Sequence, residues 1–207
     1  YHSVIELLTV GVAIGVFTIG WSTRRYAASD SLLLLGVAYA CVAVLDLAYI
    51  LASTGMGVFP ERGADLPAQL WMAARFVESL SLLAAGLVLS RRARMSGWLI
   101  LAAYAAITAI LLLLIIPLNS FPSMYLAGEG LTKIKVAGEY VVCGVLGLAL
   151  LVFWRQRAQF TRHNLSFLLA AIVATVASEI SFTLYPDVSG LFKLLGHLLK
   201  LASFVCL

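Results

Sequence analysis

Charged residues are scarce in this chain, which has 14 basic and 10 acidic side chains among 207 residues. They make up 12% of the sequence, whereas a soluble domain is about 25% charged. Hydrophobic residues account for 62%, well above the roughly 45–50% of a soluble domain. This composition excludes an ordinary water-soluble fold and indicates an integral membrane protein. The net charge of +4 does not indicate a nucleic-acid partner, because most arginines form short runs between apolar segments.

Clustered cysteines and the common catalytic motifs are also lacking. The three cysteines, Cys41, Cys143 and Cys206, lie far apart within apolar stretches, so we interpret them as packing residues rather than metal ligands. The sequence has no Gly-x-Ser-x-Gly, His-Glu-x-x-His, Walker or dinucleotide-binding motif. We therefore expect a protein that is not itself an enzyme, and the sequence identifies no cofactor.

Seven long apolar segments account for almost the whole chain. Each is close to the roughly 20 residues that a helix needs to cross a bilayer, and none shows the two-residue alternation of a transmembrane strand. We predict an all-α bundle of seven transmembrane helices forming a single domain over residues 1–207, with an output domain expected beyond residue 207. The predicted spans are 4–22, 31–53, 70–90, 98–117, 135–154, 165–184 and 190–207.

Basic residues mark alternate loops of the predicted bundle. They follow the first, third and fifth spans, and the positive-inside rule assigns these loops to the cytoplasm. The opposite loops, 54–69 and 118–134, contain fewer basic residues and more Gly and Pro. We therefore predict an outside N-terminus, a cytoplasmic C-terminus and short interfacial segments in the outer loops. The cytoplasmic arginines are Arg24, Arg25, Arg91, Arg92, Arg94, Arg155, Arg157 and Arg162.

Nine ionisable side chains lie within or at the edges of the predicted spans, all in the outer half of the bundle. Such charges are costly in a bilayer and usually face a bundle interior or a water-filled cavity. Several are spaced three or four residues apart, so they share a helix face. We predict a polar cluster open to the outside; ion pairs that only fix helix register are the alternative. The nine are Glu6, Asp46, Arg75, Glu78, Lys135, Glu139, Glu179, His197 and Lys200.

Other kinds of membrane protein remain open at this point. His2 and His197 are weak candidates for metal ligands, because two histidines on separate helices form no compact motif. A lysine in the seventh helix, Lys200, also fits a retinal-binding protein, in which Lys200 would form the Schiff base and Glu78 or Asp46 would be its counter-ion. A small transporter or proton relay is a further alternative, although the spans show no internal repeat and no paired Gly/Pro-broken helices.

Five short motifs, in order along nearly the whole chain, resemble those of one bacterial family. They are His-Ser-Val-Ile-Glu at 2–6, Leu-Asp-Leu at 45–47, Leu-Trp-Met-Ala-Ala-Arg-Phe-Val-Glu at 70–78, Gly-Leu-Thr-Lys at 130–133 and Gly-His-Leu-Leu-Lys at 196–200. Together they resemble the bacterial membrane-associated sensor domains of the third type. The chain departs from that pattern at Tyr49, where family members often have a histidine three residues after the second-span aspartate.

The resemblance implies a seven-helix sensory input domain in the bacterial inner membrane, placed before a PAS domain, a histidine kinase or a cyclic-di-GMP enzyme. Its expected partners are the lipid bilayer, a small ligand that the sequence does not identify, the covalently linked signalling module and a second copy in a homodimer. The predicted sensing residues are His2, Glu6, Asp46, Tyr49, Trp71, Arg75, Glu78, Lys133, Lys135, Glu139, Glu179, His197 and Lys200.

The arginine distribution gives a testable topology. A reporter fused after Arg94 or Arg157 should behave as cytoplasmic, because both positions follow spans that end in arginine-rich loops. A reporter inserted within residues 55–69 should behave as external. Paired activity assays with one cytoplasmic and one external reporter check this, and the reverse pattern would contradict the predicted orientation.

Overall fold

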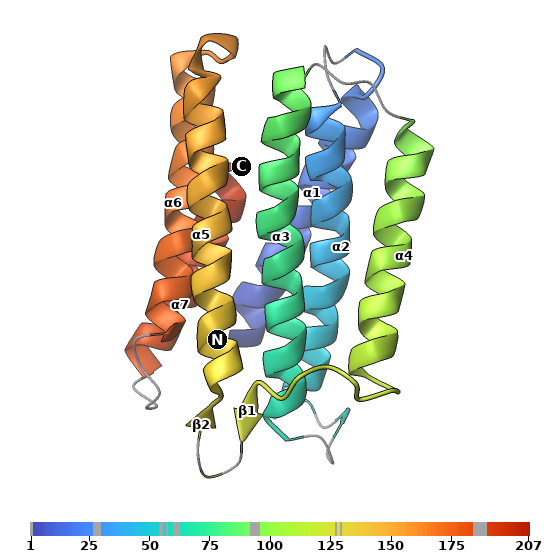
Figure 1. Cartoon of the computed structure of the whole chain (residues 1–207), viewed down its shortest axis with the longest axis vertical. Helices are drawn as coiled ribbons and strands as arrows, with labels where there is room; N and C mark the ends of the chain where they lie inside the picture. Colours follow the sequence, from blue (N-terminus) through green and yellow to red (C-terminus); the bar gives the residue numbers. More distant parts are fainter. Residues whose placement is uncertain are drawn as a thin grey trace.

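A computed structural model describes residues 2–26, 30–53, 56, 58–59, 63–91, 96–126, 128, 130–183 and 190–207. Within these residues the protein is a bundle of seven helices that run along a common axis (Figure 1). The helices coincide with the predicted apolar segments to within a few residues at most ends. They are α1 His2–Thr23, α2 Ser31–Ala52, α3 Asp65–Arg91, α4 Gly97–Ile115, α5 Lys133–Arg155, α6 Arg162–Thr183 and α7 Gly190–Cys206.

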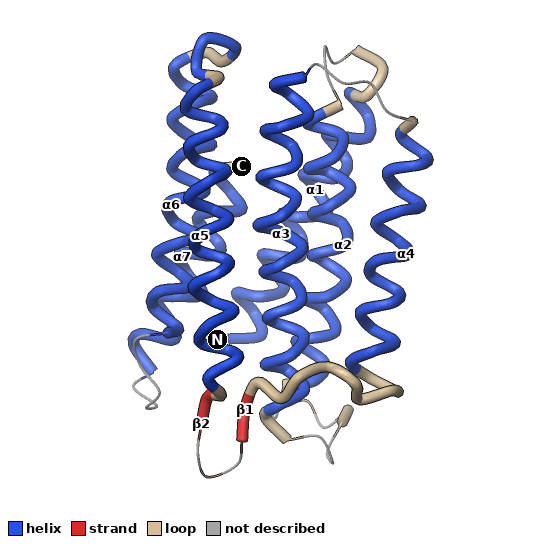
Figure 2. Tube along the Cα trace, in the orientation of Figure 1, coloured by secondary structure: helices blue, strands red, loops and turns tan. Residues whose placement is uncertain are grey.

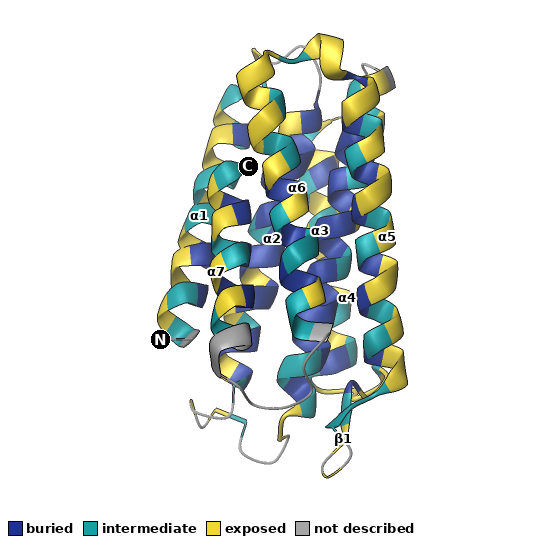
Figure 3. Ribbon diagram, turned by 90° about the vertical axis from the view of Figure 1, so that its left-hand side faces the viewer, coloured by how far each residue is buried: buried dark blue, intermediate teal, exposed yellow. Residues whose placement is uncertain are grey.

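The described helices α1 to α6 are long and apolar enough to cross a membrane, and α7 contributes the shorter apolar helix Leu194–Cys206. Their outward faces are exposed and apolar, whereas buried residues line the middle of the bundle (Figure 3). This pattern suits a lipid environment, because lipid covers apolar side chains as well as a protein core does. The chain is therefore a multi-pass membrane protein.

The helices pack in two groups, which are separated in Figure 1 between α5 and α3. Helices α1, α2 and α3 pack side by side, and α4 lies outside them against α2. Helices α5, α6 and α7 form the second group, which joins the first through α3 with α5 and through α1 with α7. Helix α2 is the most enclosed, since most of its residues are buried.

The end of the bundle predicted to face outside is closed by the segment before α5. This segment carries a small antiparallel hairpin of β1 (Tyr125–Leu126) and β2 (Gly130–Leu131), drawn as strands in Figure 2. The Asp65 carboxylate accepts hydrogen bonds from the backbone N–H groups of Met124 and Tyr125 at 2.6 and 2.8 Å. Leu66 and Met124 are buried beneath. The segment before α5 thus packs against the first turn of α3.

The same contacts explain why α3 begins five residues earlier than the predicted start at 70. In the sequence, the polar residues Asp65 and Gln69 interrupt the apolar segment. In the structure, the Gln69 side chain donates a hydrogen bond to the carbonyl of Pro122 at 3.2 Å. The loop therefore satisfies the polar first turns of the helix. As a result Glu78 is thirteen residues after the first residue of a 27-residue helix, which places it at mid-helix rather than early in the span.

Two glycines allow α1 and α2 to approach closely. A Cβ atom at Gly20 would lie 2.7 Å from the carbonyl oxygen of Leu32 and 3.1 Å from the Cα of Gly36. Small residues at such crossings are typical of helix contacts within membranes, where close packing and hydrogen bonds replace the hydrophobic effect. The crossing sets how α1 lies against α2, and therefore where Glu6 points.

We expect Gly20→Ala to destabilise the protein by about 1–3 kcal/mol, because the added methyl group meets backbone atoms that cannot move aside. Gly11→Ala is the matched control on the same helix, since no atom lies within 4 Å of its added Cβ. Thermal unfolding of both variants in detergent measures the difference. Equal unfolding temperatures would show that the α1–α2 crossing tolerates a side chain.

Candidate functional site

A chain of buried ion pairs crosses the interior of the bundle and joins α1, α2, α3 and α7. Lys200 on α7 is its centre: its Nζ lies 2.6 Å from Oε2 of Glu6 on α1 and 3.0 Å from Oδ2 of Asp46 on α2. The other oxygen of Glu6, Oε1, lies 2.7 Å from Nδ1 of His197, one turn before Lys200. Glu6 and Asp46 therefore hold α7 against the first two helices.

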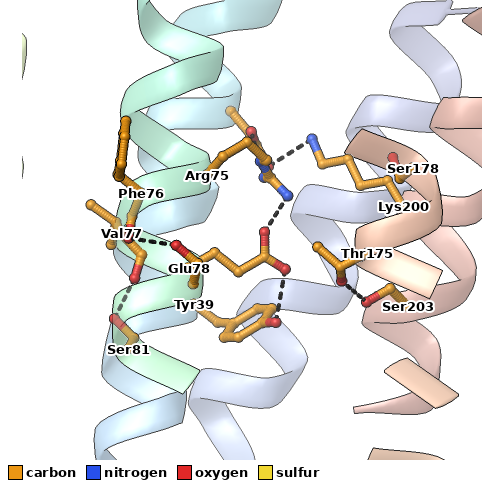
Figure 4. A network of polar contacts seen from close by, with 12 residues as sticks. Tyr39, Arg75, Phe76, Val77, Glu78, Ser81, Thr175, Ser178, Lys200 and Ser203 are labelled. Atoms are coloured by element: carbon orange, nitrogen blue, oxygen red, sulfur yellow. Dashed lines mark hydrogen bonds and ion pairs between the residues drawn. The ribbon is translucent and has the colours of Figure 1, made fainter. Parts of the chain in front are cut away.

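The chain continues from Asp46 into α3. Nη2 of Arg75 lies 3.4 Å from both Asp46 carboxylate oxygens, and Nη1 of Arg75 is paired with Oε2 of Glu78. The Tyr39 hydroxyl donates to the other Glu78 oxygen at 3.0 Å (Figure 4). Carboxylates and cations thus alternate from α7 to α3, and a tyrosine ends the chain.

Every member of this chain is buried, with 1% or less of each residue exposed. Removing a charge from water costs several kcal/mol unless a partner and further hydrogen bonds compensate it. Alternation provides that compensation, because Lys200 lies between two acids and Asp46 lies between two cations. The arrangement also makes the pairs interdependent, since each carboxylate at the centre serves two partners.

Aromatic rings lie against Lys200 and Arg75, the two cations of the ion-pair chain. The ring of Trp71 on α3 lies 4.5 Å from Nζ of Lys200 and 5.0 Å from Cζ of Arg75, within the range of a cation–π interaction. Tyr49 and Phe182 pack edge-on against the same ring, with centroids 5.4 and 4.9 Å away. Trp71 is therefore the common wall of the site.

A second buried group lies between α5 and α6. Lys135 and Glu139 form an ion pair four residues apart on α5, and Glu179 on α6 is buried within electrostatic range of Arg75, Lys135 and Glu139. The Thr132 side chain caps α5 by accepting a hydrogen bond from the Lys135 backbone N–H at 3.2 Å. This cap fixes the first turn of α5, from which the pair projects inward.

Most of the predicted sensing residues are brought together. Six form the ion-pair chain, Trp71 and Tyr49 lie beside it, and Lys135, Glu139 and Glu179 form the second group. Lys133 does not join them: its side chain is exposed, because two residues of helix turn it by about 200° from Lys135. The side chain of His2 lies outside the described part of the structure.

Three neutral residues of the site were not predicted from the sequence. Tyr39, Phe182 and Phe204 carry no charge and therefore look like ordinary packing residues. Helical spacing offers a signal for each of them, because Tyr39 is seven residues before Asp46, Phe182 is three after Glu179 and Phe204 is four after Lys200, on the same helix faces. Phe204 packs edge-on against Tyr39 with centroids 4.9 Å apart.

The geometry also bears on the alternative sites. Among the described residues, no group of three or more His, Cys, Asp or Glu side chains could hold a metal ion. The carboxylates next to the Lys200 amine are Asp46 and Glu6, whereas Glu78 pairs with Arg75. Lys200 thus has two counter-ions, Glu6 and Asp46, and Asp46 is shared with Arg75.

Arg75 offers a direct test of this interdependence. Arg75→Ala leaves Asp46 and Glu78 without their guanidinium, and removing one partner of a buried pair costs about 3–5 kcal/mol. We expect a large loss of thermal stability in detergent, while Arg155→Ala, at an exposed position, changes little. Similar unfolding temperatures for the two variants would show that Arg75 does not stabilise the buried chain.

Comparison with known proteins identifies the family. Searches of curated proteins and of solved structures find no match. A family model described as a membrane-associated sensor domain, MASE3, matches residues 1–207, the entire chain. This confirms the resemblance of the sequence motifs, and the buried, ordered charges of the bundle fit a domain that responds to its surroundings. The chain belongs to the MASE3 family of membrane-associated sensor domains.

Proposed function

We propose that the ion-pair chain is the sensing element of this domain and that α7 carries its change to a cytoplasmic signalling module. The observation that carries the proposal is the position of Lys200, whose amine binds carboxylates on both α1 and α2. A stimulus that alters either carboxylate therefore acts on α7 directly. In this proposal the signalling module follows α7 and receives the movement of that helix.

A shared carboxylate is suited to switching between two states. A ligand shifts a conformational equilibrium only by the difference in its affinity for the two states. Asp46 binds Arg75 and Lys200, and Glu6 binds His197 and Lys200. A ligand that displaces one partner of Glu6 or Asp46 leaves that carboxylate with its second partner alone. The helices that carry the two residues can then shift, so the ligand has different affinities for the two states of the bundle.

The site is placed for a stimulus that arrives from outside or within the bilayer. Glu6 lies one turn into α1, near the end of the bundle that carries the hairpin and the N-terminus (Figure 1). Helix α7 runs from this end toward the arginine-bearing connection between α5 and α6. In the orientation predicted from the arginines, the signal passes from the outer half of the bundle toward the cytoplasm.

We propose the bacterial inner membrane as the location, and a histidine kinase, PAS domain or cyclic-di-GMP enzyme as the linked module in a homodimer. Family membership and the seven-helix bundle support this role for the domain. A proton relay along the same side chains has less support. Arg75 lies between Asp46 and Glu78 in the ion-pair chain, and a guanidinium does not release its proton in proteins, so a proton has no path through it.

Signalling output tests the proposal in the protein that carries both this domain and its output module. We expect His197→Ala and Lys200→Met to hold output permanently high or low, because each removes a link between α7 and Glu6. Membrane insertion should be unchanged, as measured by the amount of protein in the membrane fraction.

Leu198→Ala is the matched control, since this residue lies between the two on α7 and is exposed. It should retain stimulus-dependent output. If His197→Ala and Lys200→Met also retain it, the ion-pair chain is structural and the sensing site lies elsewhere.

A further inference from the structure

Helices α6 and α7 are fastened to each other by hydroxyl groups along several turns. The hydroxyls of Thr175 and Ser203 lie 2.6 Å apart, and Ser203 also donates to the carbonyl of Ala171 at 2.8 Å. Toward the other end of the pair, Ser178 donates to the carbonyl of Gly196 at 2.8 Å. Figure 4 shows the Thr175–Ser203 contact beside Lys200. Hydrogen bonds to fixed backbone groups hold one helix in register with the other.

A close ring contact adds to this fastening. A Cβ atom at Gly196 would lie 2.5 Å from the ring of Phe182, so the ring of the α6 residue rests directly on the α7 backbone. The same ring is 5.1 Å from the His197 ring, centroid to centroid. Sliding of α6 along α7 would break the hydrogen bonds and drive the ring into the next side chain.

The contacts of α7 with the first helix group are of another kind. They include the ion pairs of His197 and Lys200 with Glu6 and Asp46, and edge-on aromatic contacts such as Phe204 on Tyr39. Each of these carboxylates already binds two partners, so it can strengthen one contact as the other lengthens. Edge-on rings keep contact over small shifts.

We infer that α6 and α7 move as one rigid body against α1, α2 and α3 when the ion pairs change. The unit that transmits the stimulus is then a helix hairpin rather than α7 alone. This rests on the proposed function and specifies how its site is regulated. Helix displacements of about 1–2 Å are typical of such transitions, and they require no rupture of the Ser178, Thr175 and Ser203 contacts.

Distances between spin labels in nanodiscs test the inference without a known ligand. Labels at Leu32 on α2, Phe167 on α6 and Val205 on α7 occupy exposed positions, after Cys41, Cys143 and Cys206 have been replaced by alanine. Lys200→Met removes the ion pairs with Glu6 and Asp46 and so mimics their release. Distances are measured pairwise by pulsed electron resonance.

We expect Lys200→Met to shift or broaden the 32–205 and 32–167 distances together and to leave the 167–205 distance unchanged. Glu6→Gln keeps the side-chain shape and should give the same pattern with a smaller shift, so the test does not depend on one variant folding. A change in 32–205 without one in 32–167, a change in 167–205, or three unchanged distances would each overturn the inference.

A disulfide between the two helices gives an independent check. Thr175→Cys with Ser203→Cys places two thiols within bridging range, because the native oxygens are 2.6 Å apart. The oxidised protein should show the same displacement in the Lys200→Met background. Loss of the displacement on oxidation would mean that α7 slides along α6. That result would overturn the inference that α6 and α7 move as one body. It would not decide whether the ion pairs sense the stimulus, because the signalling-output assay tests that proposal separately.

Discussion

The ion pairs of Lys200 with Glu6 and Asp46 impose a constraint on which the rest of the bundle depends. Three charges from three helices meet away from water, and each loses several kcal/mol of solvation that only its partners restore. The depth of α1, α2 and α7 in the bundle, and the rotation of each helix about its own axis, must therefore bring these three side chains to the same point. Arg75 extends the same requirement to α3. Buried ion pairs add little net stability compared with apolar packing, but breaking one is expensive, so the four helices are limited to arrangements in which every buried charge keeps a partner.

The remaining packing follows from the absence of a hydrophobic driving force between helices in lipid. Close approach at Gly20 and Gly36 joins α1 to α2, and hydroxyl contacts such as Ser31 with the Ala85 carbonyl at 2.9 Å join α2 to α3. These are the contacts expected where apolar surface alone gives no preference for protein over lipid. They hold α1, α2 and α3 together. The charges concentrate where α7 of the second group meets α1 and α2 of the first.

This division relates the structure to sensing. A domain that responds to a stimulus needs two arrangements of similar free energy, and a boundary held by shared carboxylates provides them more readily than a boundary of interlocked apolar side chains. The aromatic wall of Trp71 and Phe182 allows small shifts while it keeps water from the charges. Membership of the sensor-domain family and the placement of the charges at a boundary between helix groups therefore support the same role.

Sequence alone determined the helices and the existence of a buried charge cluster, because apolar length and the cost of intramembrane charge are local properties. It also indicated pairs within a helix, such as Arg75 with Glu78 and Lys135 with Glu139, which depend on helical spacing. Tertiary structure decided the rest. That Lys200 binds Glu6 and Asp46 together follows from the rotation and depth of each helix. The rotation and depth depend on crossings such as Gly20 against Gly36 and on the hydrogen bonds of Asp65 with Met124 and Tyr125. These contacts join separate segments of the sequence, so the spacing of residues within one helix does not predict them.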